Sequence, residues 1–314
     1  MTQKVLITGS SGYIGSHLVQ HLRDVYHDDI IIDGVDSKRP GYSTDLLNGF
    51  KCMNIISEAW GLDRDYDFIF HLAAEISVEV GSKKPFDMAW NNVMSTARVI
   101  EEVSRSTKPA TIIFASSSAV YVPWTGLNPE YSSTIGISNS FGYAASKLMG
   151  ENLLKSYDKQ SGRQSFILRL GNVAGEVHPM TENHVPETHL IPRLLANKDP
   201  YFIVHGNGDK IFRDFVHVSE VVQCMERVMK FYIPNSDLPS VINIGSGTPH
   251  SINEVIQAVN DYGFDGDLPY GVAYAGLRSP DEPVYVGMDC TLKDTFLVAD
   301  RIPLKDIIQS YLKH

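Results

Sequence analysis

The sequence predicts an α/β fold in which helices cover both faces of a doubly wound parallel sheet, with a smaller interleaved C-terminal substrate-binding domain. Short β-branched runs, the first of them "KVLIT" at residues 4–8, alternate with stretches whose apolar residues follow a helical period. A glycine-rich turn, "GSSGYIG" at residues 9–15, joins the first strand to the first helix. Strands that alternate with helices in this way build parallel sheets.

The expected elements follow one another along the chain. Strands are expected at residues 4–8, 29–36, 66–74, 110–118, 164–172 and 241–247. Helices are expected at residues 16–25, 86–106, 143–158 and 214–231. The stretch after Asn172 is rich in His, Pro and Glu, so we expect a binding loop there and no strand. Beyond residue 248 frequent Gly and Pro leave the strands unassigned.

These elements predict two interleaved domains. Residues 1–172 form the dinucleotide-binding domain, and residues 214–246 return to it. Residues 173–213 and 247–314 form the substrate-binding domain.

Composition excludes several classes of partner. The 314 residues carry 27 basic and 37 acidic side chains, a net charge of −10, which argues against nucleic acid or an anionic membrane surface. No apolar run reaches membrane-spanning length and no leader precedes the first strand. The three cysteines, Cys52, Cys224 and Cys290, are widely spaced and lack metal-ligand spacing. We therefore expect reduced thiols, no metal and a cytoplasmic location.

The turn after the first strand is a candidate phosphate site. Gly9, Gly12 and Gly15 follow a GxxGxxG spacing. Glycine lets backbone N–H groups approach a pyrophosphate closely, and the helix N-terminus adds partial positive charge. We expect this loop to bind a dinucleotide.

An acidic residue at the end of the second strand indicates which dinucleotide. Asp36 lies about 20 residues past the last glycine, where a carboxylate binds the ribose diol and disfavours a 2′-phosphate. Asp33 is a neighbour that could take the same role. NAD is therefore favoured over NADP, although Lys38 and Arg39 directly after Asp36 weaken that preference.

Tyr143 and Lys147 lie four residues apart in "FGYAASKLMGENLLKSY", so on a helix they share one face. An isolated pair of this kind is more often a surface tyrosine beside a solvated lysine. A serine-bearing strand end, "SSS" at residues 116–118, precedes Tyr143 by about 25 residues, downstream of the dinucleotide loop. Together these features indicate catalysis.

The combined pattern of GxxGxxG, "HLAA" at 71–74, Asn92, "SSS" at 116–118 and Tyr143-xxx-Lys147 resembles the extended short-chain dehydrogenase/reductases. The resemblance covers essentially the whole chain and implies a Rossmann domain that binds NAD. Within this family the chain is most similar to the UDP-hexose 4-epimerases, because "PETHLIP" at 186–192 is typical of bacterial UDP-galactose 4-epimerases.

Two more segments carry the resemblance, "GNGDKIFRDFVHVSEV" at 206–221 and "LRSPDEPVYVGMD" at 277–289. They imply that Arg213 and Arg278 bind the substrate diphosphate, as does Asn172 at the end of "LRLGN". Two departures stand out: Glu75 occupies a place that is usually small or neutral, and Ser77 stands where some epimerases have a lysine near the pyrophosphate.

The candidate site residues fall into three groups. The catalytic residues are Ser117, Tyr143 and Lys147, with Ser116 and Ser118 as rivals of Ser117. The candidate cofactor-binding residues are Gly9, Gly12, Tyr13, Ile14, Gly15, Asp36, Ser37, Asn54, Ile55, Leu72, Ala73, Ala74, Asn92, Tyr143 and Lys147. The candidate substrate-binding residues are Ser117, Ser118, Asn172, Leu190, Arg213, Arg278 and Tyr285.

The resemblance implies inversion of C4 of a UDP-hexose, with UDP-glucose and UDP-galactose as the expected pair. Lys147, helped by the positively charged nicotinamide, is expected to lower the pKa of the Tyr143 phenol, which then accepts the proton of the sugar hydroxyl. The 4-keto sugar turns about its diphosphate linkage and takes the hydride back on the opposite face. Family members commonly pair as homodimers, here through residues 86–106 and 143–158.

Other activities are alternatives. UDP-N-acetylhexosamine, UDP-uronate and UDP-pentose are other candidate substrates, although a bulky Tyr285 resembles enzymes restricted to plain hexoses. Dehydratases of this family carry an Asp-Glu pair directly after the catalytic Ser or Thr, where this chain has Ser118 and Ala119, and the glutamate of decarboxylating relatives is also missing. A non-catalytic NAD-binding regulator would typically lack the Tyr or the Lys.

Overall fold

The structure is a computed structural model that describes most of the chain. The described residues are 2–41, 44–56, 60, 65–77, 83–106, 108, 110–122, 126–134, 141–176, 189–232, 238–276, 285–297 and 301–312. For residues 141 and 285 only the backbone is described.

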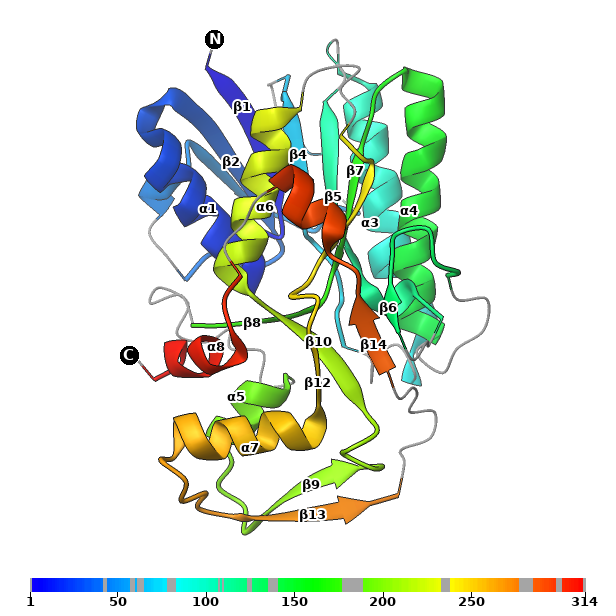
Figure 1. Cartoon of the computed structure of the whole chain (residues 1–314). Helices are drawn as coiled ribbons and strands as arrows, with labels where there is room; N and C mark the ends of the chain where they lie inside the picture. Colours follow the sequence, from blue (N-terminus) through cyan, green and yellow to red (C-terminus); the bar gives the residue numbers. More distant parts are fainter. Residues whose placement is uncertain are drawn as a thin grey trace.

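Seven parallel strands form the main sheet (Figure 1). Their order across it is β11 (Val241–Ile244), β7 (Phe166–Leu170), β5 (Thr111–Ser117), β4 (Phe68–His71), β1 (Gln3–Thr8), β2 (Ile30–Asp36) and β3 (Gly49–Cys52). Every neighbouring pair is parallel. The chain therefore begins in the middle of the sheet and winds outward in both directions, which confirms the predicted doubly wound fold.

Helices cover both faces of this sheet, and the alternation of strand side chains decides which face each helix covers. On one face, α1 (Tyr13–Tyr26) and α6 (Val218–Phe231) bury Leu18 and Val221 against Val5 and Ile7 of β1. On the other face, α3 (Pro85–Ser104) and α4 (Phe141–Ser161) pack against Leu6 and its neighbours. Figure 1 shows α3 and α4 side by side on one side of the molecule, with α1 and α6 on the other.

The C-terminal part contains a second, mixed sheet and a small helical layer. Its strands run in the order β12 (Pro249–Ser251), β10 (Phe212–His217), β14 (Tyr285–Met288) and β6 (Leu127–Asn128), and β8 (Asn172–Ala174) also pairs with β10. A separate parallel pair joins β9 (Tyr201–His205) to β13 (Gly271–Ala275). The helices of this part are α5 (Leu190–Leu195), α7 (Ile252–Gly263) and α8 (Leu304–Ser310), which share a third apolar cluster.

Two expectations for this region were wrong. Residues 214–217, expected to begin a helix, belong to β10, because Phe215 and Val216 pair with β8 and the helix begins only at Val218. The helix is capped by the side chain of His217, which accepts from the Ser219 N–H, so none of the usual Ser, Thr, Asp or Asn caps marked its start. Residues 173 and 174, expected in a loop, form β8 together with Asn172 by pairing with the same strand.

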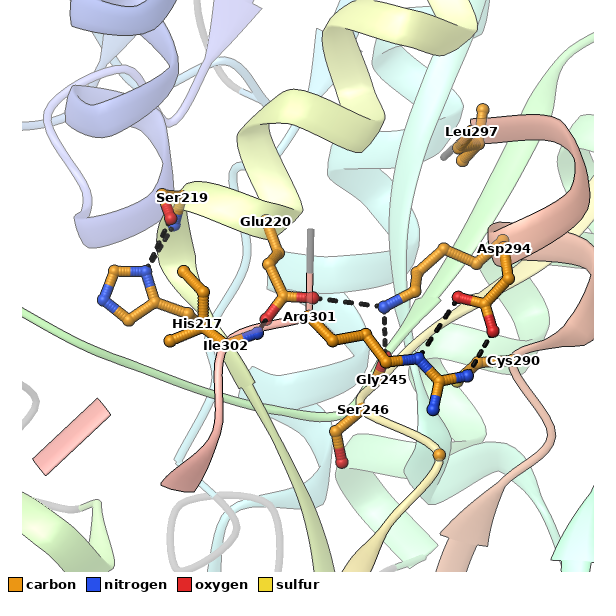
Figure 2. A network of polar contacts seen from close by, with 12 residues as sticks. His217, Ser219, Glu220, Gly245, Ser246, Cys290, Asp294, Leu297, Arg301 and Ile302 are labelled. Carbon is orange, nitrogen blue, oxygen red and sulfur yellow. Dashed lines mark hydrogen bonds and ion pairs between the residues drawn. The ribbon is translucent and has the colours of Figure 1, made fainter. Parts of the chain in front are cut away.

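A buried ion pair ties the C-terminal segment to α6 (Figure 2). Lys293 Nζ, fully buried in a π-helical turn at Lys293–Leu297, lies 3.2 Å from Glu220 Oε2 and donates to the carbonyl of Gly245 at 2.7 Å. The other oxygen of Glu220 accepts the N–H of Ile302 at 2.8 Å. One carboxylate of α6 thus holds both the π-helical turn and the irregular segment that leads into α8.

We expect Lys293→Met to cost about 3–5 kcal/mol of the free energy of unfolding, because Glu220 is then left as an unpaired buried charge. The double variant Lys293→Met/Glu220→Gln should lose much less, since a neutral amide oxygen still accepts from Ile302. Urea unfolding of the two variants and the wild type measures the difference. Equal losses in the single and double variants would contradict this view of the pair.

Candidate active site

The glycine loop packs closely against the backbone of the segment that follows β4. Gly9 has a φ of +75°, and a Cβ on it would meet the backbone nitrogen of Ala73 at 2.7 Å. A Cβ on Gly15 would meet the carbonyl oxygen of Gly9 at 2.1 Å. No side chain caps the N-terminus of α1, where Gly12 is the cap residue. The loop therefore leaves a close backbone approach and uncapped helix N–H groups for a pyrophosphate, so these residues fit a dinucleotide.

The structure separates the two candidate ribose acids. Asp36 ends β2, and its carboxylate accepts the N–H groups of Ser11, inside the glycine loop, and of Lys38, both at 3.0 Å. Asp33 lies inside the same strand, buried, and accepts the hydroxyl of Tyr66 at 2.7 Å. Only Asp36 lies beside the glycine loop at the carboxyl edge of the sheet.

Three further cofactor candidates lie near the ends of β2 and β3. Ser37 is exposed directly after Asp36. Asn54 is exposed, and its side-chain oxygen accepts the N–H of Ile56 at 3.0 Å. Ile55 is buried in the apolar cluster between the sheet and α3, and its carbonyl accepts the indole N–H of Trp60 at 3.0 Å.

Asn92 connects the segment after β4 to helix α4. Its amide oxygen accepts the N–H of Glu75 at 2.7 Å, and its amide nitrogen donates to the Glu75 carbonyl and to Ser146 Oγ, both at 2.9 Å. Ser146 in turn donates to the carbonyl of Tyr143 at 2.7 Å. These contacts fix the position of Glu75, and with it the end of the "HLAA" segment that contains Leu72, Ala73 and Ala74, relative to the start of α4. The geometry thus points to a positioning role for Asn92.

The three consecutive serines at the end of β5 have different surroundings. Ser117 Oγ accepts the N–H of Ala119 at 3.1 Å, and the Ser117 side chain is near enough to the phenol of Tyr143 to lower the pKa of that phenol. Ser116 points to the other side and donates to Glu151 at 2.6 Å. Ser118 is buried in the short 3₁₀ turn that follows β5. Of the three, Ser117 is the one whose side chain lies beside the phenol of Tyr143.

Burial shifts the pKa values of the tyrosine and lysine in opposite directions. Burial raises the pKa of Tyr143, and the hydrogen bond with Ser117 acts against that rise. Burial lowers the pKa of Lys147 to about 8. The Lys147 ammonium donates to the carbonyl of Ala115 at 2.8 Å and lies 5.0 Å from the centre of the Phe114 ring. That Lys147, helped by a bound nicotinamide, lowers the pKa of Tyr143 stays a prediction; in this structure Ser117 is the group whose side chain lowers it.

His71 is buried near Lys147. The sequence analysis gave this histidine no role of its own. Its ring nitrogens bond Thr8 Oγ1 at 2.8 Å and Thr96 Oγ1 at 3.0 Å, so it joins β4 to both β1 and α3. Burial first, and then the charge of Lys147, lower its pKa to about 3. A neutral His71 therefore adds no charge beside the lysine. The sequence signal that could have pointed to His71 is the "HLAA" motif, of which it is the first residue.

The substrate-side candidates lie on the second sheet and on α5. Asn172, the first residue of β8, donates to the carbonyl of Asp214 at 3.3 Å, and the half-buried Arg213 lies next to Asp214 on β10. Leu190 begins α5 and packs against the third apolar cluster. Arg278, residues 186–188 and the side chain of Tyr285 lie outside the described residues.

The comparisons with known proteins place this arrangement in a family. Residues 5–245 match the NAD dependent epimerase/dehydratase family. Among relatives, the chain is 28% identical to the UDP-glucose 4-epimerase of Mycoplasma genitalium, over 97% of this chain and 94% of that protein. It is also 29% identical to a UDP-N-acetyl-alpha-D-glucosaminuronate decarboxylase of Bacillus cytotoxicus, over 90% of each.

A solved structure gives the same result. The UDP-glucuronic acid 4-epimerase from Bacillus cereus, solved in complex with UDP-glucuronic acid and NAD, superposes with a TM-score of 0.81 at 25% identity, over 98% of this chain and 97% of that one. The chain belongs to the NAD dependent epimerase/dehydratase family, an extended short-chain dehydrogenase/reductase family whose cofactor is NAD.

Two kinds of feature are absent from the described residues. Among them, no helix is long and apolar enough to cross a membrane. The same residues hold no group of three or more His, Cys, Asp or Glu side chains arranged to bind a metal ion.

We expect Asp36→Ala to weaken NAD binding by about 10- to 100-fold, because a charged acceptor of two ribose hydroxyls is lost at roughly 1.5–3 kcal/mol. NADP binding should weaken less. Asp29→Ala is the matched control, since Asp29 is exposed just before the other end of β2. Calorimetric titration with each dinucleotide measures both. An unchanged ratio of NAD to NADP affinity would contradict the assignment of Asp36.

Proposed function

We propose that this protein is a UDP-sugar 4-epimerase, and that its substrates are UDP-glucose and UDP-galactose. The observation that carries the proposal is that Ser117 lies beside the phenol of Tyr143 at the end of β5, while Lys147, one helical turn further along α4, is buried and donates to the Ala115 carbonyl of the same strand at 2.8 Å. These groups follow or flank β5, one strand from the segment that packs on the glycine loop. A hydroxyl held between Ser117 and Tyr143 would thus lie beside a bound nicotinamide.

Each of the three side chains has a definite part in the reaction. Tyr143 accepts the proton of the sugar 4-hydroxyl, and Ser117 shares that hydrogen bond and orients the hydroxyl. The cofactor, when bound, supplies a hydride acceptor for C4 and a positive charge near the phenol. Lys147 binds the nicotinamide ribose and offsets the developing phenolate charge. After the sugar has turned, hydride would return from the reduced cofactor to the opposite face of C4 and Tyr143 would return the proton to the 4-oxygen, which completes the inversion.

The substrate side has to grip the nucleotide and leave the sugar free to turn. We propose that Arg213, Arg278 and Asn172 bind the diphosphate, because two arginines supply local positive charge in a protein of net charge −10. Ser118, Leu190 and Tyr285 complete the substrate pocket in this proposal. The 4-keto sugar then rotates about its diphosphate linkage while the nucleotide stays fixed.

The residues after Ser117 favour epimerisation over dehydration or decarboxylation. A dehydratase needs a carboxylate there to move a proton and expel water, whereas Ser118 and Ala119 occupy those positions in the 3₁₀ turn. The presence of Ser117, Tyr143 and Lys147 together also argues against a non-catalytic regulator.

UDP-glucuronate is the second candidate substrate, because the B. cereus 4-epimerase that acts on this sugar superposes over nearly the whole chain. The deciding experiment incubates the pure protein separately with UDP-glucose, UDP-N-acetylglucosamine, UDP-glucuronate and UDP-xylose and resolves the products. We expect UDP-galactose from UDP-glucose. Conversion of UDP-N-acetylglucosamine or UDP-glucuronate but not of UDP-glucose would overturn the substrate assignment, and no conversion of any would overturn the proposed activity.

We expect Tyr143→Phe to lower kcat by roughly 10²- to 10⁴-fold, because the proton acceptor is removed while the ring remains. Tyr157→Phe is the matched control, since it makes the same change near the far end of the same helix. Steady-state kinetics and circular dichroism of both variants test this. A Tyr143→Phe enzyme that kept most of its activity would contradict the mechanism.

We also propose that two copies of the chain pair through α3 and α4. Phe86, Trp90 and Met94 lie four residues apart on α3 and are 73%, 48% and 40% exposed, and Met149 on α4 is 52% exposed. Large apolar side chains in a row on two adjacent helices are suited to burial against the same helices of a second copy.

Trp90→Glu should convert the dimer into a monomer, because the substitution places a charge in the apolar interface. Light scattering after size-exclusion chromatography gives the mass directly. Val25→Glu on α1 changes an equally exposed apolar residue away from α3 and α4 and should leave the dimer intact. A wild-type mass near 35 kDa would disprove the pairing.

A cytoplasmic location is the remaining part of the proposal. All three cysteines are free thiols, Cys52 exposed and Cys224 and Cys290 buried. Free thiols suit a reducing compartment, where nucleotide sugars and NAD are also available.

A further inference from the structure

We propose that Ser116, Glu151 and Arg169 form a buried triad of positioning residues, which sets the distance between the catalytic hydroxyls of Ser117 and Tyr143. Among the described residues, no hydrogen bond or ion pair joins any of the three to a side chain proposed to bind substrate or cofactor. The inference rests on the proposed catalytic role of Tyr143.

The triad is tightly bonded and excluded from water. Ser116 Oγ donates to Glu151 Oε1 at 2.6 Å. Arg169 holds the same carboxylate with two parallel bonds, from Nε to Oε1 at 3.0 Å and from Nη2 to Oε2 at 2.7 Å. The three side chains are 3%, 0% and 3% exposed. A bidentate arginine–carboxylate pair of this kind fixes orientation as well as distance.

Arg169 is itself held from other directions. Its Nη1 donates to the carbonyl of Glu130 at 2.9 Å, and its guanidinium lies 4.8 Å from the centre of the Tyr121 ring. The hydroxyl of Tyr121 donates to Asn243 Oδ1 at 2.6 Å, so the contacts continue to β11. The arginine is therefore a fixed point against which Glu151 and Ser116 are placed.

The connection to the catalytic pair is short on both sides. Ser116 and Ser117 are consecutive on β5, so their side chains point to opposite faces, and Ser116 pairs across the sheet with Arg169 of β7. Glu151 is one helical turn beyond Lys147 and two beyond Tyr143 on α4. A slip at the Ser116–Glu151 contact therefore moves the strand end that carries Ser117 relative to the helix that carries Tyr143.

Such a slip matters because catalysis depends steeply on the placement of reacting groups. Hydrogen bonds weaken rapidly as distance and angle depart from the optimum. A misplacement of about 1 Å can cost on the order of 10²-fold in rate. Loosening the triad should also weaken the Ser117 hydrogen bond that opposes the rise in the Tyr143 pKa.

The chain contains a matched control for a purely structural role. Ser165 is a second buried serine that donates to a carboxylate of α4, from its Oγ to Asp158 Oδ1, also at 2.6 Å. This contact lies near the C-terminal end of the helix, far along it from Tyr143. Ser116→Ala and Ser165→Ala thus remove similar hydrogen bonds from the same helix, one at its middle and one near its C-terminal end.

The test compares these two variants with the wild type and with Ser116→Thr, all saturated with NAD. Stability is measured by thermal unfolding, kcat and KM on the accepted UDP-sugar, and the Tyr143 pKa by NMR of ¹³C-tyrosine protein, with the Tyr143 signal assigned from Tyr143→Phe. We expect both alanine variants to lose similar stability. Only Ser116→Ala should lower kcat, by about tenfold or more at unchanged KM, and raise the Tyr143 pKa, and Ser116→Thr should restore both.

Two results would overturn the proposal: an unmoved Tyr143 pKa in Ser116→Ala, or equal changes in Ser116→Ala and Ser165→Ala. The NMR titration needs no turnover. A wild-type protein without activity on any UDP-sugar would therefore disprove the proposed function and still leave the positioning role decided by the shift of the Tyr143 signal.

Discussion

The buried Lys147 of helix α4 donates to the carbonyl of Ala115 in β5 at 2.8 Å, and this bond joins the main sheet to the helix that carries Tyr143, beside Ser117. The strand end that carries Ser117 lies one strand from the segment that packs on the glycine loop. On the helix side, Asn92 and Ser146 fix the turn that carries Tyr143. The sheet, α3 and α4 thus meet where a sugar hydroxyl would lose its proton.

Burial in this site disfavours the charged forms of Tyr143 and Lys147, and this shapes its chemistry. Burial raises the pKa of Tyr143 and lowers that of Lys147 to about 8, so both side chains are pushed towards their neutral forms. Each unit of such a shift corresponds to roughly 1.4 kcal/mol. The protein therefore supplies geometry: a phenol beside Ser117 and a lysine held on the Ala115 carbonyl. In our account, the bound cofactor supplies the positive charge that makes the phenol basic.

Much of the fold follows from local signals, and the remainder depends on pairings that no local signal reveals. The β-branched runs and the glycine turn were enough to predict the parallel sheet and its helices. The strand Phe212–His217 was assigned in part to a helix, because its identity depends on pairing with Asn172–Ala174, whose polar flanking sequence hid a strand of three residues. The sequence of β12, β13 and β14 is short and interrupted by Gly and Pro, so long-range contacts determine those strands.

In the candidate site, too, some residues could be predicted from local sequence signals and others depend on long-range contacts. Spacing along the chain singled out the glycines, Tyr143 and Lys147. It left Asp36 and Asp33 as alternatives, and burial beside Tyr66 is what distinguishes Asp33. It likewise could not reveal the contacts of Glu151, because that residue is polar on a helix of low amphipathicity and finds Arg169 only across the packed layer.

The central claim is that the proton leaves the 4-hydroxyl through Tyr143 while hydride leaves C4 and returns to the same carbon. UDP-glucose labelled with deuterium at C4 tests it directly. The account predicts UDP-galactose that retains the deuterium at C4, with none released to water, together with a slower rate than for unlabelled substrate. Deuterium found in solvent, or moved to another carbon of the product, would contradict it.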